Sequence, residues 1–190
     1  MGRSTFSGPV RSDTGFIGPA LATGAGTGIT TGTDTVYSSS VNRSGTIIHT
    51  QIYIDIDGLT GSATLADIIG VENAANCHLG QITVAECGVL FAGSITCLET
   101  PAGGEIDIDF YSATLATGTE DALVTALDEV VLKISAANWA ALGSFAMTPA
   151  LPRANDYIYM SVGDTDGGEY TAGKFMIELY GYVTPDVLVP

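Results

Sequence analysis

The sequence predicts an all-β protein, a two-sheet sandwich of jelly-roll type with short helical insertions and an extended N-terminal arm. Apolar and polar residues alternate in several segments, as expected for strands whose successive side chains point to opposite faces. Glycines and prolines that favour turns separate these segments, and no long helical pattern alternates with them. Parallel strands need long, usually helical crossovers, so antiparallel sheets are expected here.

Residues 1–45 differ in composition from the rest and are expected to form the N-terminal arm, with the β-sandwich body at residues 46–190. Gly, Ser and Thr make up more than half of residues 1–45, so this segment buries little apolar surface and should not fold alone. Its spaced apolar residues suit an extended arm lying on another surface: Phe6, Pro9, Val10, Phe16, Ile17 and Pro19. A disordered terminus is the alternative, and residues 29–37 could contribute one weak strand.

The body begins with a predicted strand and a predicted short helix. The strand covers residues 46–57, where isoleucines recur at every second position and therefore share one face. The helix covers residues 63–69, because Ser62 is a suitable N-cap and Gly70 is a suitable terminator.

Residues 81–113 are the stretch around which the rest of the body is organised. They predict two or three consecutive strands, the last two joined by a turn at residues 101–104. In the last of these strands the alternation is nearly perfect. Its apolar face consists of Ile106, Ile108 and Phe110, and its polar face consists of Glu105, Asp107, Asp109 and Tyr111. This pattern predicts a sheet with one dry face and one acidic, solvated face.

The last part of the body predicts three more strands and two short helices. The helices cover residues 119–127 and 136–142, with a strand between them at residues 130–135. Two closing strands cover residues 157–162 and 174–182, each with apolar residues inward and tyrosines outward.

The charge of the chain limits its partners. The sequence contains 21 acidic and 6 basic residues, a net charge of −15, and nearly all of the acidic excess follows residue 45. Such a surface repels phosphate backbones and anionic lipid, so no direct nucleic-acid or membrane partner is expected. The first residues lack the apolar core of a signal peptide, and no apolar run reaches the length of a membrane helix. Synthesis in a cytoplasm, without export, is expected.

Cys77, Cys87 and Cys97 are expected to be reduced and structural. Their number is odd, and their spacing of ten residues matches no zinc-binding pattern, which requires close pairs of ligands. A reducing compartment is consistent with three free thiols.

No catalytic constellation is visible, and the chain is expected not to be an enzyme. Nucleophilic catalysis needs a base beside an activated nucleophile, but His49 and His78 are the only histidines and neither lies in a nucleophile signature. A glycosidase needs two carboxylates, one of them with a raised pKa. The acidic residues on strand faces have no visible cause for such a shift, so a solvated sheet face is the preferred interpretation.

Two weaker patterns concern binding. Asp164, Asp166 and Glu169 resemble an oxygen-rich calcium loop without the full EF-hand spacing, and an ordinary acidic turn is the alternative. No cofactor is expected apart from this possible Ca²⁺. The strand tyrosines could form an aromatic patch that binds a protein or a sugar, or they could cover a second sheet. They are Tyr157, Tyr159, Tyr180 and Tyr182.

The opening STFSGPVRS at residues 4–12, followed by Gly15 and Phe16, resembles the start of small head proteins of tailed bacteriophages. Those chains also combine a Gly/Ser/Thr-rich arm with an acidic, β-rich body. The motif covers about the first tenth of the chain, and the remainder is similar in style. The resemblance implies a capsid decoration, or cement, protein: a non-enzymatic accessory on the exterior of the virion. Its partners would be the major capsid protein or other virion subunits, and a homotrimer is the favoured oligomer.

Two other classes of function remain open from the sequence. One is a receptor- or glycan-binding β-sandwich module of a phage tail or fibre, and the other is a carbohydrate-active enzyme. The candidate partner-binding residues are Phe6, Pro9, Val10, Arg11, Phe16, Ile17, Tyr157, Tyr159, Tyr180 and Tyr182.

Overall fold

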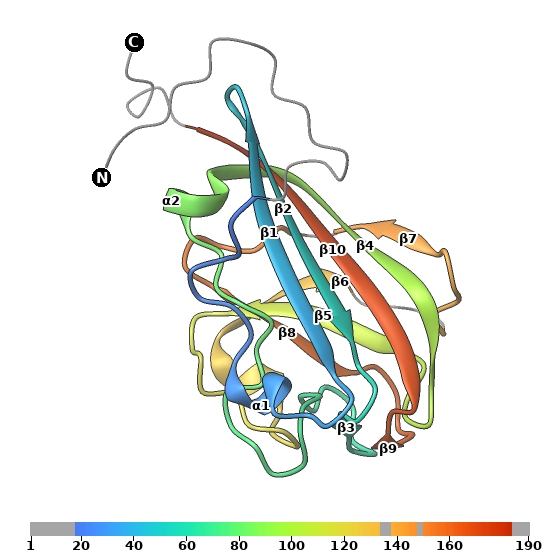
Figure 1. Cartoon of the computed structure of the whole chain (residues 1–190). Coiled ribbons are helices and arrows are strands. Elements are labelled where there is room, and N and C mark those ends of the chain that lie inside the picture. The colour runs from blue at the N-terminus through green and yellow to red at the C-terminus, as the bar shows by residue number, and fades with distance from the viewer. Residues whose placement is uncertain (1–17, 134–137, 148–149, 184–190) are drawn as a thin grey trace.

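Antiparallel β-sheets are the main regular structure of the molecule (Figure 1). The computed structural model describes residues 18–133, 138–147 and 150–183. Within these residues, a five-stranded sheet has the order β1 (Val36–Ser44), β2 (Ile47–Asp55), β10 (Ala172–Tyr182), β4 (Val89–Ala102) and β7 (Ser144–Ala146). A three-stranded sheet has the order β6 (Glu129–Lys133), β5 (Ile108–Ala113) and β8 (Tyr157–Val162), and β3 (Thr60–Gly61) pairs with β9 (Gly168–Glu169).

Helices are short in the described residues. They are α1 (Thr27–Thr30), α2 (Val84–Cys87) and a 3-10 helix, η1 (Val124–Leu127). The prediction of a mostly β protein with antiparallel sheets and few helices is therefore confirmed. None of these helices is long and apolar enough to cross a membrane.

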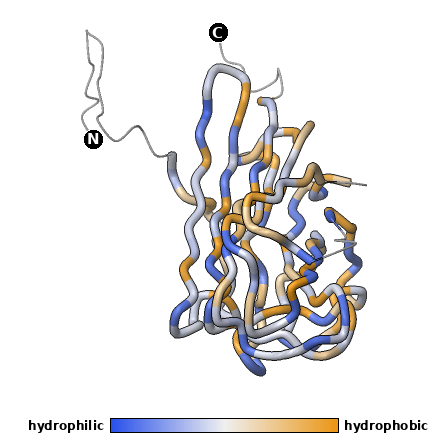
Figure 2. The backbone as a smooth tube through the Cα atoms, turned by 90° about the vertical axis from the view of Figure 1, so that its right-hand side faces the viewer, coloured by the Kyte–Doolittle hydropathy of each residue, from blue (hydrophilic) through white to orange (hydrophobic). Residues whose placement is uncertain are grey.

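Three aromatic side chains join the two larger sheets. The ring of Phe110 on β5 lies 5.4 Å from that of Phe175 on β10, between ring centroids, and Trp139 packs edge-on against both at 6.0 and 5.3 Å. All three are buried, and the Trp139 indole donates a hydrogen bond of 2.7 Å to the carbonyl of Ile108. Figure 2 shows apolar and hydrophilic residues interleaved along the strands that enclose this core.

The predicted alternation of buried and accessible residues is confirmed in β2 and β10. In β8 it is wrong, because every residue from Ile158 to Val162 is buried, including Tyr159, which was expected to point outward. In β2, Ile52 and Ile54 are fully buried between exposed or half-buried polar neighbours. In β10, every second residue from Gly173 to Gly181 is buried. The predicted strand at residues 130–135 corresponds to β6, where Leu132 is buried.

The body begins earlier than residue 45, so the expected boundary is wrong. β1 pairs with β2 along its whole length, and Leu21 and Ile29 are buried in the common core. The composition of this segment misled the prediction, because β1 alternates serines with side chains that touch the core and gains its stability from β2. The prediction of an arm now concerns residues 1–17, which lie outside the described residues.

The connection after β4 differs from the predicted turn between two neighbouring strands. β4 lies in the five-stranded sheet and β5 in the three-stranded sheet, so the chain crosses from one sheet to the other. The predicted solvated face of β5 is also wrong, because Asp109 and Tyr111 are buried along with Ile108 and Phe110.

A layer of irregular chain explains why both faces of β5 are buried. Tyr159 of β8 lies opposite Tyr111 and is fully buried, with its hydroxyl donating to the Leu115 carbonyl at 2.6 Å and accepting from the Gly118 N–H at 3.3 Å. The segment at residues 114–119 therefore lies over the outer face of the small sheet. Residues 66–82 lie along the free edge of β8, where the N–H of Leu79 donates to Ile158 at 2.7 Å.

The predicted helices at residues 63–69 and 119–127 are wrong, apart from the short η1. Ala66 and Asp121 have positive φ angles of 69° and 63°, which a helix does not allow. Their neighbours instead make inter-segment hydrogen bonds, such as that from the Ile68 N–H to the Ala122 carbonyl. The described part of the predicted helix at residues 136–142 is not helical either.

Candidate functional site

An apolar groove runs across one end of the molecule. Its first part, of about 210 Å³, is lined by residues 82–84, 88–90 and 151–154. Its second part, of about 490 Å³, is lined by residues 91–93, 146–147 and 150–151. Leu151 lines both parts, so the two adjoin between the start of β4 and the segment at residues 150–154.

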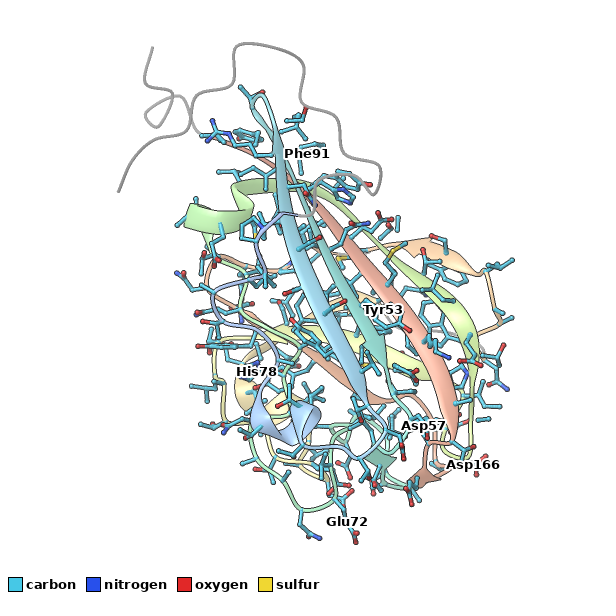
Figure 3. All side chains as sticks on the ribbon, in the orientation of Figure 1. Tyr53, Asp57, Glu72, His78, Phe91 and Asp166 are labelled. Carbon is cyan, nitrogen blue, oxygen red and sulfur yellow. The ribbon has the colours of Figure 1, made fainter. Side chains whose placement is uncertain are left out.

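Four exposed apolar side chains stand at the same end, and together they are called the apolar rim. They are Ile47, Val84, Phe91 and Tyr182, each between 41% and 53% exposed. Tyr182 pairs with Ile47 on one side and with Val89 on the other, and its ring lies 6.4 Å from that of Phe91. Figure 3 shows Phe91 at this end of the molecule. A cluster of exposed large apolar side chains beside a groove is typical of a surface that binds another protein.

The exposure of Phe91 follows from an irregularity in the sheet. On β4, Ala92 pairs with Tyr180 and Leu90 pairs with Gly181, so Phe91 is an extra residue in the register. A residue inserted in this way bends its strand and is directed away from the regular pairing. Phe91 is consequently held outside the core by the backbone of β4.

Helix α2 is fixed against the rim by its cap and by a glycine. The Thr83 hydroxyl accepts a hydrogen bond from the Glu86 N–H, and the Glu86 carboxylate accepts one of 2.7 Å from the Ala22 N–H. Gly88, which ends the helix, has a φ of 71°, and a Cβ there would lie 2.5 Å from the Tyr182 carbonyl oxygen. Only glycine combines this conformation with so close an approach.

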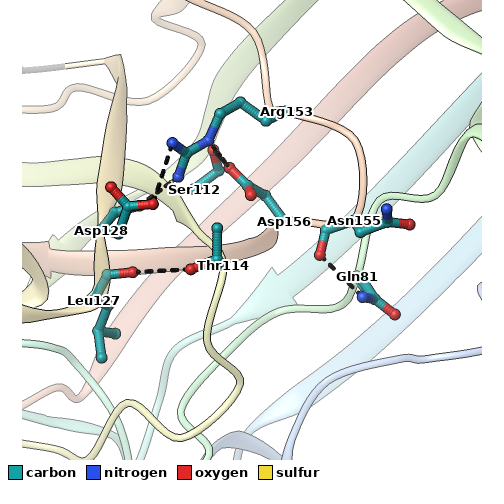
Figure 4. Close-up of polar contacts among 8 residues, drawn as sticks. All are labelled: Gln81, Ser112, Thr114, Leu127, Asp128, Arg153, Asn155 and Asp156. Carbon is teal, nitrogen blue, oxygen red and sulfur yellow. Dashed lines mark hydrogen bonds and ion pairs between the residues drawn. The ribbon is translucent and has the colours of Figure 1, made fainter.

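The opposite wall of the groove is held by a buried carboxylate (Figure 4). Asp156, which is 1% exposed, accepts hydrogen bonds from the Ser112 hydroxyl at 2.8 Å and from Nε of Arg153 at 2.9 Å. The hydrogen bond to Asp156 raises the pKa of Arg153, whose guanidinium also donates to the Asp128 carbonyl. These contacts connect the groove wall to β5 and to the residue preceding β6.

Both ends of the described chain lie at the groove end. The Gly18 N–H donates to Oδ1 of Asn42 at 2.8 Å, and the Pro19 carbonyl accepts from the Val41 N–H at 2.8 Å. The Val183 N–H donates to the Thr46 carbonyl at 2.9 Å. The turn between β1 and β2 and helix α2 also lie at this end (Figure 1).

The opposite end of the molecule is acidic. Figure 3 shows Asp57, Glu72 and Asp166 there, at the far end of the sheet from Phe91. Lys174, one of four basic residues in the described chain, pairs with Asp55 at 3.5 Å and with Glu99. The remaining described bases are Arg43, near the β1–β2 turn, Arg153, in the groove wall, and Lys133, whose amine lies 4.9 Å from the Phe145 ring centroid.

The four predicted tyrosines do not form one patch, because they belong to two different sheets. Tyr159 is fully buried, and Tyr157 packs against His78 at 4.7 Å between ring centroids. Tyr180 stacks on His49 at 4.6 Å, and Tyr182 alone belongs to the apolar rim. The other partner-binding candidates lie outside the described residues: Phe6, Pro9, Val10, Arg11, Phe16 and Ile17.

The acidic turn at Asp164, Asp166 and Glu169 is organised by a carboxylate that sequence reasoning assigned to a solvated face. Glu105 is buried and accepts hydrogen bonds from the N–H groups of Asp107 at 2.8 Å and Asp166 at 3.1 Å. Glu169 lies in β9, paired with Thr60. In the part of the chain that the structure describes, no three His, Cys, Asp or Glu side chains are grouped so as to hold a metal ion.

The neighbouring Cys77 and His78 do not form an activated pair. Burial raises the pKa of the Cys77 thiol to about 12, so the thiol stays protonated and unreactive at neutral pH. Burial also lowers the pKa of His78, whose Nδ1 has no hydrogen-bond partner. Cys87 and Cys97 are likewise buried and free.

Comparison with known proteins identifies no relative: no family model, no curated protein and no solved structure matches the chain.

Proposed function

We propose that the protein is a non-enzymatic structural subunit that docks on a protein lattice through its apolar end. In this proposal it decorates or cements the capsid of a tailed bacteriophage, as the sequence resemblance at residues 4–16 suggests. The observation that carries the proposal is the difference between the two ends of the body. One end presents the apolar rim and groove, and the other presents the carboxylates of Asp57, Glu72 and Asp166 together with the separate exposed side chains of Val36 and Leu65.

This polarity favours one orientation on a partner. Docking of the apolar end removes Phe91, Tyr182 and their neighbours from water, which is favourable in proportion to the apolar area buried. Docking of the acidic end would bring carboxylates against a partner that must supply matching cations. The acidic end therefore faces solvent in the proposed assembly, where its charge also keeps the particle surface soluble.

The position at which residue 18 joins the body supports a role for residues 1–17 in the same attachment. Residues 19 and 21 run antiparallel beside β1, and Gly18, the first described residue, is held by Asn42 at the groove end. Residues 1–17 contain Phe6, Val10 and Phe16, which could occupy pockets of a neighbouring subunit while their backbone adds to a sheet edge. In a homotrimer, binding of one such segment would hold the other two near their own binding sites and so raise their effective concentration there.

We also propose that the two larger sheets form a two-sheet sandwich of jelly-roll type. The contact of Phe110 with Phe175 across the two sheets supports the sandwich arrangement. Jelly-roll folds are common among viral capsid domains. This is an analogy of fold, and a shared fold does not by itself establish a shared function.

Co-sedimentation with purified phage shells tests the function. The full-length protein is expected to bind, and Phe91→Asp is expected to weaken binding by about tenfold or more, because it places a charge in the contact. Asp166→Asn, at the acidic end, is the matched control and should bind as the wild type does. Removal of residues 1–17 should also weaken binding while the circular dichroism spectrum stays unchanged. Equal binding by the wild type and Phe91→Asp would refute docking through the apolar end.

A further inference from the structure

The outer face of the five-stranded sheet carries an ordered set of polar and aromatic side chains. On β2 and β10 the residues between the buried positions point away from the core, and they face each other across the two strands. His49 lies opposite Tyr180, Gln51 opposite Glu178, and Tyr53 opposite Met176. Figure 3 shows Tyr53 midway along the sheet, away from both the apolar rim and the acidic end.

A depression of about 290 Å³ lies on this face beside Tyr53. Its lining includes Ser38 and Ser40 of β1, Gln51 and Tyr53 of β2, and Met176 of β10. The depression exists because β1 contributes small serines opposite larger side chains on β2: Ser38 is the partner of Tyr53, and Ser40 is the partner of Gln51. Its volume is close to the lower limit for ligand pockets, about 300 Å³, so it suits one small ring.

The polar groups around the depression are held in place by one another. Oε1 of Glu178 accepts hydrogen bonds from Nε2 of Gln51 at 3.3 Å, and Nε2 of His49 lies 3.0 Å from the same oxygen. The His49 ring is stacked on Tyr180 with an angle of 2° between the ring planes. On the other side, the Asn42 amide donates to the Ser40 hydroxyl at 3.3 Å, so that hydroxyl can donate to a ligand.

We propose that this depression binds a neutral hexopyranose unit of a glycan. Tyr53 offers an apolar ring surface with a polar hydroxyl, and Met176 adds a second apolar contact. The hydroxyls of Ser38 and Ser40 offer donors and acceptors to sugar hydroxyls, and Gln51, whose Nε2 donates to Glu178 and Met176, offers its amide oxygen as an acceptor. None of the lining residues is charged, and Glu178 lies next to them, so an anionic ligand would find no cation to neutralise it.

This site is independent of the proposed docking, because it lies on the sheet face and the groove lies at one end. A subunit fastened by the apolar end would keep the depression exposed to solvent. It would then add to the particle an affinity for neutral polysaccharide. Many copies on one lattice would make a weak single contact effective.

Two-dimensional NMR of the full-length protein tests the proposal. The probes are maltotriose, cellotriose and mannotriose as neutral sugars, with sialyllactose as the anionic comparison. At least one neutral sugar is expected to bind with a Kd on the order of 1 mM, as expected for a ligand with few contacts. The shifted amide signals should cluster at residues 38–40 and 51–53 and at Met176. Absence of shifts with all three neutral sugars, or binding of sialyllactose alone, would overturn the proposal.

Matched variants localise the binding. Tyr53→Ala and Gln51→Ala should each weaken sugar binding by about tenfold or more, because each removes a lining contact. Ser94→Ala, on the same sheet face but outside the depression, should leave the Kd within about twofold of the wild type. All three variants must retain the wild-type circular dichroism spectrum and cooperative unfolding. Equal weakening by Ser94→Ala and Tyr53→Ala would overturn the assignment to the depression. A gain or loss of shell binding in Tyr53→Ala would contradict the independence of the two surfaces.

Discussion

The outer faces of the two larger sheets differ, although β5 and β10 have similar alternating sequences. In β10 the alternation corresponds to one buried and one accessible face, and the accessible face carries Glu178 and Tyr180. In β5 every residue is buried, including Asp109 and Tyr111. Alternation thus shows which residues share a face, but it does not show whether other chain segments cover that face. On the small sheet the segment at residues 114–119 provides the cover, and the large sheet has no equivalent among the described residues.

The largest loss of stability is expected from a substitution in the core between the two larger sheets. Phe110→Ala removes a fully buried ring that contacts Phe175 and Trp139, and it should lower the free energy of unfolding by about 3–5 kcal/mol. Urea unfolding followed by circular dichroism measures this loss. A loss below about 1 kcal/mol would show that the two sheets do not share one well-packed core.

Two Tyr→Phe variants compare the covered outer face of the small sheet with the open outer face of the large sheet, and their effects on stability are expected to be smaller. Tyr159→Phe leaves the Leu115 carbonyl and the Gly118 N–H without the hydroxyl partner, and it should lower the free energy of unfolding by about 1–3 kcal/mol. Tyr180→Phe removes the corresponding hydroxyl from the open face, where water replaces it, and should change stability by less than about 0.5 kcal/mol. Equal losses in the two variants would contradict the cover over the small sheet.

The stability of the folded protein is expected to depend on pH through His78, which packs against Tyr157 and Tyr159 on the covered face. Because burial lowers the pKa of His78, the unfolded chain binds a proton at a higher pH than the folded protein does. The contribution of neutral His78 to the free energy of unfolding is therefore fully present above the pKa of the imidazole in the unfolded chain, about 6.5. It is lost as the pH falls below that value. Burial raises the pKa of Glu120 to about 7, and this carboxyl contributes the opposite slope, losing stability as the pH rises toward 7.

Unfolding free energies at pH 7.5 and pH 5.5 separate the two groups. The wild type should lose more stability on acidification than His78→Gln does, because the glutamine does not titrate. Glu120→Gln should increase the loss on acidification, since it removes the opposing contribution. An identical pH dependence in the wild type and His78→Gln would show that the imidazole is solvated in the folded protein.

The smallest expected effect lies at the centre of the open face. Ser94 pairs with Glu178 on β10 and with Ala146 on β7, and its side chain is partly accessible. Ser94→Ala should change the free energy of unfolding by less than about 0.5 kcal/mol. A loss above 1 kcal/mol in urea unfolding would indicate that another segment covers this face.

Local sequence patterns predicted the strands but not the layers around them. β2, β8 and β10 were predictable because each has an apolar face and makes long regular pairings. The segments at residues 63–69 and 119–127 carry helix-like caps and spacing, but their backbone groups are satisfied by β8 and by each other. Tertiary hydrogen bonds therefore overrode a weak local preference.

The candidate sites could hardly be predicted from the sequence, because residues that are distant in the chain form them. The groove brings Leu90 beside Leu151, and the depression brings Ser40 of β1 beside Met176 of β10. Exposure of Phe91 depends on a register shift between β4 and β10. The one signal in the sequence was Tyr182, which ends an alternating strand with its side chain on the polar face.

The position of β10 has a consequence for how the chain acquires its structure. β10 is the last strand of the described chain, yet it lies in the middle of the large sheet between β2 and β4. The partners His49 and Glu178 are 129 residues apart, so the central pairing closes a very long loop. During synthesis, β2 and β4 leave the ribosome with unpaired edges and must wait for β10 before the sheet is continuous. Such non-local pairing makes folding slow and exposes strand edges in the meantime. A chain that stops before β10 would retain those edges and be prone to aggregate.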